Sequence, residues 1–172
     1  METIIINKTK GNKQDFEDLR WCLLANNPKS INEKVRGILI KDGLVVATDG
    51  FRLHLILNKL NIKNGYYEVN SNKVNQIVIS KNDSPHYDFL SICPEWKPRN
   101  YIPCYVNNSL FFREIYHNFF YPEIVWDTNY VRDAWMDNSI ISVSKESSPY
   151  TPLCIYDNDR RGAIIMPRRI IV

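Results

Sequence analysis

Residues 44–57 read Leu-Val-Val-Ala-Thr-Asp-Gly-Phe-Arg-Leu-His-Leu-Ile-Leu, and the fold is predicted most directly from this stretch. The apolar run Leu44–Thr48 is typical of a strand, and Asp49-Gly50 after it indicates a tight turn or a bulge. Apolar residues then alternate over Arg52–Leu57, which predicts a second strand with three residues on one face: Leu53, Leu55 and Leu57. Two strands joined by a turn are therefore expected here.

The residues before this hairpin predict a strand, a helix and another strand. Met1–Asn7 contains a run of isoleucines and indicates a strand. Over Lys13–Asn26 the spacing changes to that of an amphipathic helix, whose apolar stripe consists of Phe16, Leu19, Cys22 and Leu23. Val35–Ile40 favours a strand, and Asp42-Gly43 predicts a tight hairpin to the strand that follows.

The second half of the chain repeats this order. After short strands predicted over Tyr66–Val69 and Gln76–Ser80, the proline-dense stretch Lys81–Pro103 predicts an extended connector. Beyond it, Tyr105-Val106 end a strand, and Ser109 is a candidate N-cap for a helix. The apolar face of that helix would consist of Phe112, Ile115, Tyr116 and Phe119. A short helix over Asp127–Met136 and three further strands complete the pattern, the strands at Ile140–Val143, Leu153–Tyr156 and Ala163–Ile171.

This order of elements predicts an α+β fold. We expect a single domain over residues 1–172, built from two pseudo-symmetric halves at roughly 1–80 and 104–172 that are joined by the connector 81–103. In each half a helix would pack on one side of mostly antiparallel strands.

Composition excludes several classes of protein. With 172 residues, 44% hydrophobic and 24% charged, the chain is neither a disordered tail nor a coiled-coil rod. Its apolar runs are a few residues long, whereas a membrane span needs about 20, and no signal peptide is indicated. The four cysteines are Cys22, Cys93, Cys104 and Cys154, and none of them forms a C-x-x-C pair. This spacing predicts a reducing cytoplasm, no zinc site and no disulfide framework.

The charge of the chain is only weakly basic. A net charge of +3 is too small to indicate nucleic-acid binding by itself. Residues 1–86 carry 13 basic and 9 acidic residues, whereas residues 87–172 carry 9 and 10, so the positive charge lies toward the amino terminus.

No enzyme signature is found. The histidines at positions 54, 86 and 117 have no neighbour in sequence that would complete a nucleophile–base pair, and surface or hydrogen-bonded structural roles are favoured for them. Asp157 and Asp159 could hold a metal ion, although a solvated hairpin turn is favoured. The six glycines are scattered singly and make no phosphate loop. We therefore expect no enzymatic activity, no cofactor and no metal.

Two segments combine arginines and turn residues with apolar strand residues, namely 34–53 and 160–170. Such a surface could form an apolar groove with a charged lip that takes an extended peptide. The alternative is a strand that ends in a turn, together with a carboxy-terminal edge strand solubilised by arginine, and composition alone favours it.

These two segments carry a resemblance to a known family. Val46–Leu53 resembles the ATDGxRL motif of bacterial DNA polymerase III β subunits, the sliding clamps, and Ile165–Ile170 is similar to their MPxRL ending. Asn32–Gly37 looks like the clamp segment between the first helix and the next strand, and Val106–Leu110 like the start of the second helix of a clamp domain.

The resemblance implies the DNA-clamp fold, in which a ring closes around DNA with helices lining the hole and strands facing outward. This chain has room for one such domain, whereas a bacterial clamp chain carries three. Two expectations therefore stay open: copies of the chain assemble into a homo-oligomer, either ring or dimer, or the protein is not a ring.

The resemblance also implies a pocket for peptides of polymerases and clamp loaders. Its first wall would consist of Thr48, Gly50, Arg52 and Leu53, and its carboxy-terminal wall of Met166, Pro167 and Arg168. Arg52 would bind peptide carbonyls or carboxylates, while Leu53 and Met166 would give apolar contact. Phe51 stands where the family often has a smaller or polar residue. Either the pocket is retained or the motifs persist for folding.

Encirclement of DNA would require cations that face phosphates. The candidate contacts are Lys8, Lys10, Lys13, Arg20, Lys29 and Arg113. On the first predicted helix, however, the acidic residues outnumber the basic ones, so that this helix by itself is not basic.

The leading hypothesis is a non-enzymatic, cytoplasmic, sliding-clamp-like protein of DNA replication or repair that binds DNA, clamp-binding peptides, or both. A second hypothesis is a regulator or decoy that occupies polymerase or clamp-loader partners without encircling DNA. An unrecognised enzyme is the third.

Overall fold

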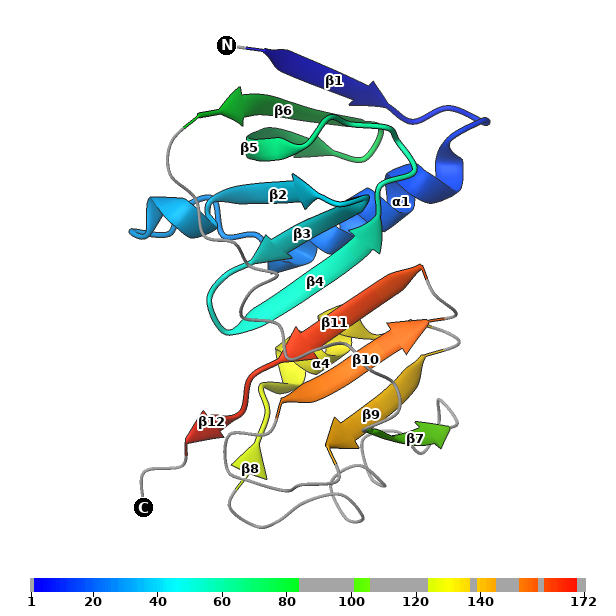
Figure 1. Ribbon diagram of the computed structural model, residues 1–172, viewed down its shortest axis with the longest axis vertical. Helices are drawn as coiled ribbons and strands as arrows, with labels where there is room; N and C mark the ends of the chain where they lie inside the picture. Colours follow the sequence, from blue (N-terminus) through cyan, green and yellow to red (C-terminus); the bar gives the residue numbers. More distant parts are fainter. Residues whose placement is uncertain are drawn as a thin grey trace. The chain divides into compact units, whose positions relative to one another are not determined.

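The chain forms two compact units, Met1–Pro94 and Glu95–Val172 (Figure 1). The computed structural model describes residues 2–83, 101–105, 124–136, 139–144, 152–157 and 160–169. The boundary between the units falls inside the predicted connector 81–103. That the two units make one domain stays a prediction.

Unit 1 is built on an antiparallel sheet. Its strands follow one another in the order β1-β6-β5-β2-β3-β4. Their bounds are β1 (Thr3–Asn7), β2 (Gly37–Lys41), β3 (Leu44–Thr48), β4 (Arg52–Leu57), β5 (Gly65–Lys73) and β6 (Gln76–Asn82). Each strand predicted in this half is confirmed, and β5 runs further than predicted.

Helix α1 (Lys13–Cys22) packs on β3 and β4 of this sheet. Its predicted apolar stripe is confirmed, because Phe16, Leu19 and Cys22 are fully buried. The short 3₁₀ helix η1 (Leu23–Ala25) continues it and ends at Asn26, the residue at which the sequence predicts an end. A second short 3₁₀ helix, η2 (Glu33–Val35), leads into β2.

Two glycines of unit 1 have distinct backbone roles. Asp42 and Gly43 both have positive φ angles, 52° and 78°, as a two-residue hairpin turn between β2 and β3 requires. Gly37 has no room for a side chain, because a Cβ there would lie 2.2 Å from the carbonyl oxygen of Tyr67 on the neighbouring strand β5. The predicted hairpin at Asp42-Gly43 is thus confirmed.

The face of β4 that carries Leu55 and Leu57 is less buried than the opposite face. Leu55 is half-buried and Leu57 is exposed, whereas Arg52, His54 and Ile56 on the opposite face are all buried. The reason is the helix: His54 stacks on Trp21 of α1, with the ring centroids 4.3 Å apart. Alternation shows that a strand has two faces but not which of them a helix will cover.

Within unit 2, strands pair antiparallel in the order β11-β10-β9-β7. Their bounds are β7 (Tyr101–Tyr105), β9 (Ile140–Ser144), β10 (Leu153–Asp157) and β11 (Arg161–Ile165). Helix α4 (Thr128–Ala134) contacts β11 and confirms the short helix predicted there. A two-stranded sheet joins β8 (Ile124–Val125) to β12 (Arg168–Arg169). The α+β fold class is confirmed.

Two predictions about extended segments are wrong. The connector 81–103 is not free of elements, because β6 continues to Asn82 and β7 begins at Tyr101. Pro103 fits into β7, opposite Ser142, since β7 is outermost among the described strands of its sheet and a missing donor is tolerated at an edge.

The predicted strand Ala163–Ile171 is also wrong as a single element. It divides into β11 and β12 at Met166-Pro167, where proline has no N–H to continue the ladder. The predicted second helix at 109–119 and most of the connector lie outside the described residues.

Candidate peptide-binding site

The turn between β3 and β4 contains the first predicted pocket wall. The Thr48 hydroxyl donates a hydrogen bond to the Arg52 carbonyl oxygen at 2.6 Å and accepts one from the Gly50 N–H at 3.0 Å. Gly50 has a φ of +95°, a conformation that favours glycine. Thr48 and Gly50 therefore shape the turn itself.

The Asp49 carboxylate organises the same turn. Its Oδ1 accepts hydrogen bonds from the backbone N–H groups of Phe51 and Arg52, both at 3.0 Å. Its Oδ2 accepts from Arg52 Nε at 3.1 Å, in an ion pair whose side chains are 10% and 11% exposed. Asp49, which the pocket prediction omits, thus positions the backbone of the turn and the guanidinium together.

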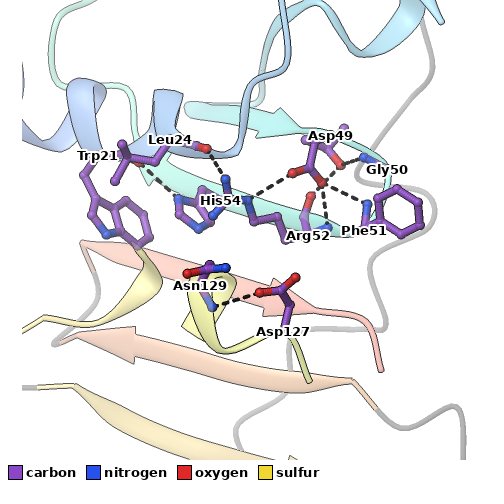
Figure 2. A network of polar contacts seen from close by, with 10 residues as sticks. Trp21, Leu24, Asp49, Gly50, Phe51, Arg52, His54, Asp127 and Asn129 are labelled. Atoms are coloured by element: carbon purple, nitrogen blue, oxygen red, sulfur yellow. Dashed lines mark hydrogen bonds and ion pairs between the residues drawn. The ribbon is translucent and has the colours of Figure 1, made fainter. Parts of the chain in front are cut away.

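Arg52 fastens this turn to the end of the helix. Its Nη2 donates to the carbonyl oxygen of Leu24 in η1, a group at a helix end that lacks an intrahelical partner (Figure 2). The guanidinium is therefore buried between Asp49 and Leu24 rather than directed at solvent. This arrangement supports a folding role for the motif.

The exposed apolar surface beside this turn comes from Phe51 and Leu24 and not from Leu53, the residue predicted to provide it. Leu53 is 6% exposed, whereas Phe51 is 64% and Leu24 is 44% exposed. Figure 2 shows the Phe51 ring turned away from the polar network. The sequence holds one signal for Phe51, an aromatic residue inside an Asp-Gly turn, and none for Leu24, which continues the helical run.

The carboxy-terminal wall belongs to unit 2. Met166 is 44% exposed and Pro167 is half-buried, directly after β11. Arg168 follows in β12, where it pairs with Val125 of β8. The structure thus brings four predicted residues together at the β3–β4 turn of unit 1 and the other three together in unit 2.

Two groups of the kinds that act in catalysis, the His54 imidazole and the Cys22 thiol, are buried and hydrogen-bonded. His54 is fully buried, and its Nδ1 lies 3.0 Å from the Trp21 carbonyl oxygen, which can only accept. Burial raises the pKa of the Cys22 thiol, whose Sγ lies 3.5 Å from the His54 carbonyl oxygen. Both predictions, a hydrogen-bonded histidine and a buried thiol, are confirmed. His86, His117 and Asp159 lie outside the described residues.

The candidate DNA contacts fall into two groups. Lys8 and Arg20 both pair with Glu17 of α1, Arg20 Nη1 lying 3.5 Å from Oε2. The hydrogen bond from Lys8 is the main cause that lowers the pKa of Glu17, so its carboxylate is charged at neutral pH. The second group, Lys10, Lys13 and Lys29, is exposed. Arg113 lies outside the described residues.

No group of three or more His, Cys, Asp or Glu residues is placed to hold a metal ion in the described ranges. Within the same residues, none of the helices is both long and apolar enough to span a bilayer.

Comparison with solved structures defines the fold. The DNA polymerase III β subunit from Borrelia burgdorferi, solved in complex with a natural product, matches 99% of this chain at a TM-score of 0.62 and 11% identity. The sliding clamp from Bacillus subtilis matches 98% at a TM-score of 0.57 and 14% identity. The chain has the sliding-clamp fold. No protein-family model matches the sequence, and no curated protein sequence matches it either.

This clamp-fold chain is shorter than the clamps that it matches. It covers 65% of the Borrelia burgdorferi subunit and 64% of the Bacillus subtilis clamp. The Helicobacter pylori β clamp, solved bound to a DNA ligase peptide, matches 98% of this chain at a TM-score of 0.56 and 14% identity, with 66% of its own length covered.

Proposed function

We propose that this chain is a non-enzymatic, sliding-clamp-like protein of DNA replication or repair that binds short peptides of polymerase or clamp-loader partners. The clamp fold over 98–99% of the chain is the observation that carries the proposal. A neighbour of the same fold was solved with a DNA ligase peptide, which supports peptides as the class of ligand.

Each unit carries its own proposed peptide-contacting surface. On unit 1 it consists of the exposed side chains of Phe51 and Leu24 beside the turn that Arg52 anchors. On unit 2 it consists of Met166, a flexible and polarizable side chain that adapts to different partners. Thr48, Gly50, Arg52 and Leu53 hold the turn of the unit 1 surface in shape. Pro167 and Arg168 follow Met166 in the unit 2 surface.

A peptide titration tests this proposal. Fluorescence anisotropy with a labelled clamp-binding peptide should show binding to the wild type and about tenfold weaker binding for F51A and for M166A, because each substitution removes exposed apolar contact area. The matched control is I31A, which truncates a side chain that is 97% exposed on a loop of unit 1. Equal affinities for all four proteins would refute the pocket.

DNA contact is the second part of the proposal. Three exposed lysines, Lys10, Lys13 and Lys29, are available to phosphates, while Glu17 holds Lys8 and Arg20. The variant E17Q releases both cations, so DNA should bind more tightly and with a steeper dependence of log K on log salt, by about two. Filter binding of duplex DNA over a salt series measures both quantities.

The alternative is a regulator or decoy that occupies clamp partners without touching DNA. The pairing of Lys8 and Arg20 with one carboxylate favours it, since this pairing reduces the net positive charge beside α1. Peptide binding without DNA binding, by wild type and E17Q even at low salt, would establish the decoy and exclude DNA contact.

A further inference from the structure

Strand β1 presents an open edge of the sheet in unit 1. It pairs with β6 on one side and is outermost among the described strands of that unit (Figure 1). An open edge offers backbone N–H and C=O groups to another strand, and proteins usually protect it with charged side chains, proline or a bulge.

The register with β6 shows which backbone groups face outward. The Lys81 N–H donates to the Glu2 carbonyl oxygen at 2.8 Å, and the Lys8 N–H donates to the Asn75 carbonyl oxygen at 2.9 Å. Even-numbered residues of β1 therefore bond to β6, since the direction alternates along an antiparallel strand. The N–H and C=O groups of the odd-numbered residues, Thr3, Ile5 and Asn7, point toward the open edge, where the Asn7 carbonyl oxygen already accepts a hydrogen bond from Asn12 Nδ2 at 3.0 Å.

No charged residue or proline protects these odd-numbered positions. Thr3, Ile5 and Asn7 are all exposed, and the Ile5 side chain is 58% exposed although it is large and apolar. Ile5 lies opposite Val78 of β6, which is half-buried on the same face of the sheet. This edge is thus both open and apolar.

The sequence of this edge is complementary to its own reverse. Residues 2–8 read Glu-Thr-Ile-Ile-Ile-Asn-Lys. Laid antiparallel on a second copy with Ile5 opposite Ile5, the segment places Thr3 opposite Asn7 and Glu2 opposite Lys8, and both ends carry the same pair of opposite charges. This register also sets odd-numbered residues against odd-numbered residues, so that their outward N–H and C=O groups face one another as in hydrogen-bonded pairs, the Asn7 carbonyl oxygen being shared with Asn12 Nδ2 of its own copy.

We propose that two copies of this chain associate through β1, antiparallel, about a two-fold axis at Ile5. The pairing joins two unit 1 sheets by backbone hydrogen bonds from Thr3, Ile5 and Asn7 of each copy. Ile4 of one copy packs opposite Ile6 of the other, and Glu2 lies opposite Lys8, whose ammonium group also pairs with Glu17 of its own copy. Such an interface is isologous and closes as a dimer. It does not depend on the function proposed above.

The oligomeric state tests this inference. Sedimentation velocity of the full chain over a dilution series should show a dimer that dissociates on dilution. The variant I5K should be a monomer throughout, because it places two ammonium groups at the two-fold axis. The matched control I31K makes the same change at a side chain that is 97% exposed on a loop, and it should dimerise as the wild type does. A monomeric wild type, or an I5K variant that dimerises equally, would overturn the proposal.

Amide exchange of the wild type gives a test that needs no variant. The amides of Ile4 and Ile6 should be protected at all concentrations, because they bond to β6. Those of Thr3, Ile5 and Asn7 should exchange rapidly in dilute solution and become protected only under dimer conditions. Rapid exchange of the Ile5 amide in a dimeric sample would place the interface elsewhere and refute pairing through β1.

Discussion

Arg52, the first residue of β4, connects the β3–β4 turn to the short helix η1. Its guanidinium joins the Asp49 carboxylate to the Leu24 carbonyl oxygen, and the Asp49 carboxylate in turn accepts the N–H groups of Phe51 and Arg52. Removal of a buried cation leaves its partner carboxylate desolvated and unpaired, which costs more free energy than the ion pair itself contributes. The stability of the turn therefore depends on this side chain.

The variant R52A should lower the free energy of unfolding by about 2 to 4 kcal/mol, since the ion pair with Asp49 is nearly buried. Urea denaturation measures this change. The control R132A removes an arginine that is 67% exposed in its side chain, and it should change stability by less than about 0.5 kcal/mol. If R52A were no less stable than R132A, the guanidinium would not be an anchor of the fold.

The residues of the candidate site were only partly predictable. The sequence indicates Thr48, Gly50 and Arg52 through their motif, but packing decides that Arg52 is turned inward and that Phe51 is left outside. No sequence pattern shows that the carbonyl of Leu24 lies within reach of an arginine 28 residues away. Contacts between distant segments need the folded chain.

At the scale of elements, prediction works where the pattern is local. The hairpins at Asp42-Gly43 and Asp49-Gly50, the helix at Lys13 and most strand bounds follow from turn chemistry and periodicity. The end of β7 agrees with the strand predicted to end at Tyr105-Val106, whereas prediction fails at the start of β7, inside the predicted connector, and at the break between β11 and β12. In both places the effect of a proline depends on whether the neighbouring strand needs the missing hydrogen bond.

Close approach between β2 and β5 gives a prediction at this scale. The variant G37A should destabilise unit 1 by about 1 to 3 kcal/mol, because its Cβ would lie 2.2 Å from the Tyr67 carbonyl oxygen and backbone would have to move. The matched control G11A meets nothing within 4 Å and should be neutral. Thermal unfolding followed by circular dichroism compares the two, and equal midpoints would contradict the tight contact.

At the scale of the whole molecule, the fold is retained at very low sequence identity. The clamps that it matches share 11–15% of their residues with this chain, and their fold covers 98–99% of it. Binary pattern and turn positions, rather than particular core residues, are sufficient to specify such a sheet. The same tolerance explains why the fold class was predictable from the sequence.

The arginine anchor has a consequence for how this surface can evolve. Its acceptor at position 24 is a main-chain oxygen, which every amino acid supplies, so mutation of that codon leaves the anchor in place. The exposed Leu24 side chain is thus free to vary, and the apolar surface beside the turn can differ between related sequences without loosening the turn.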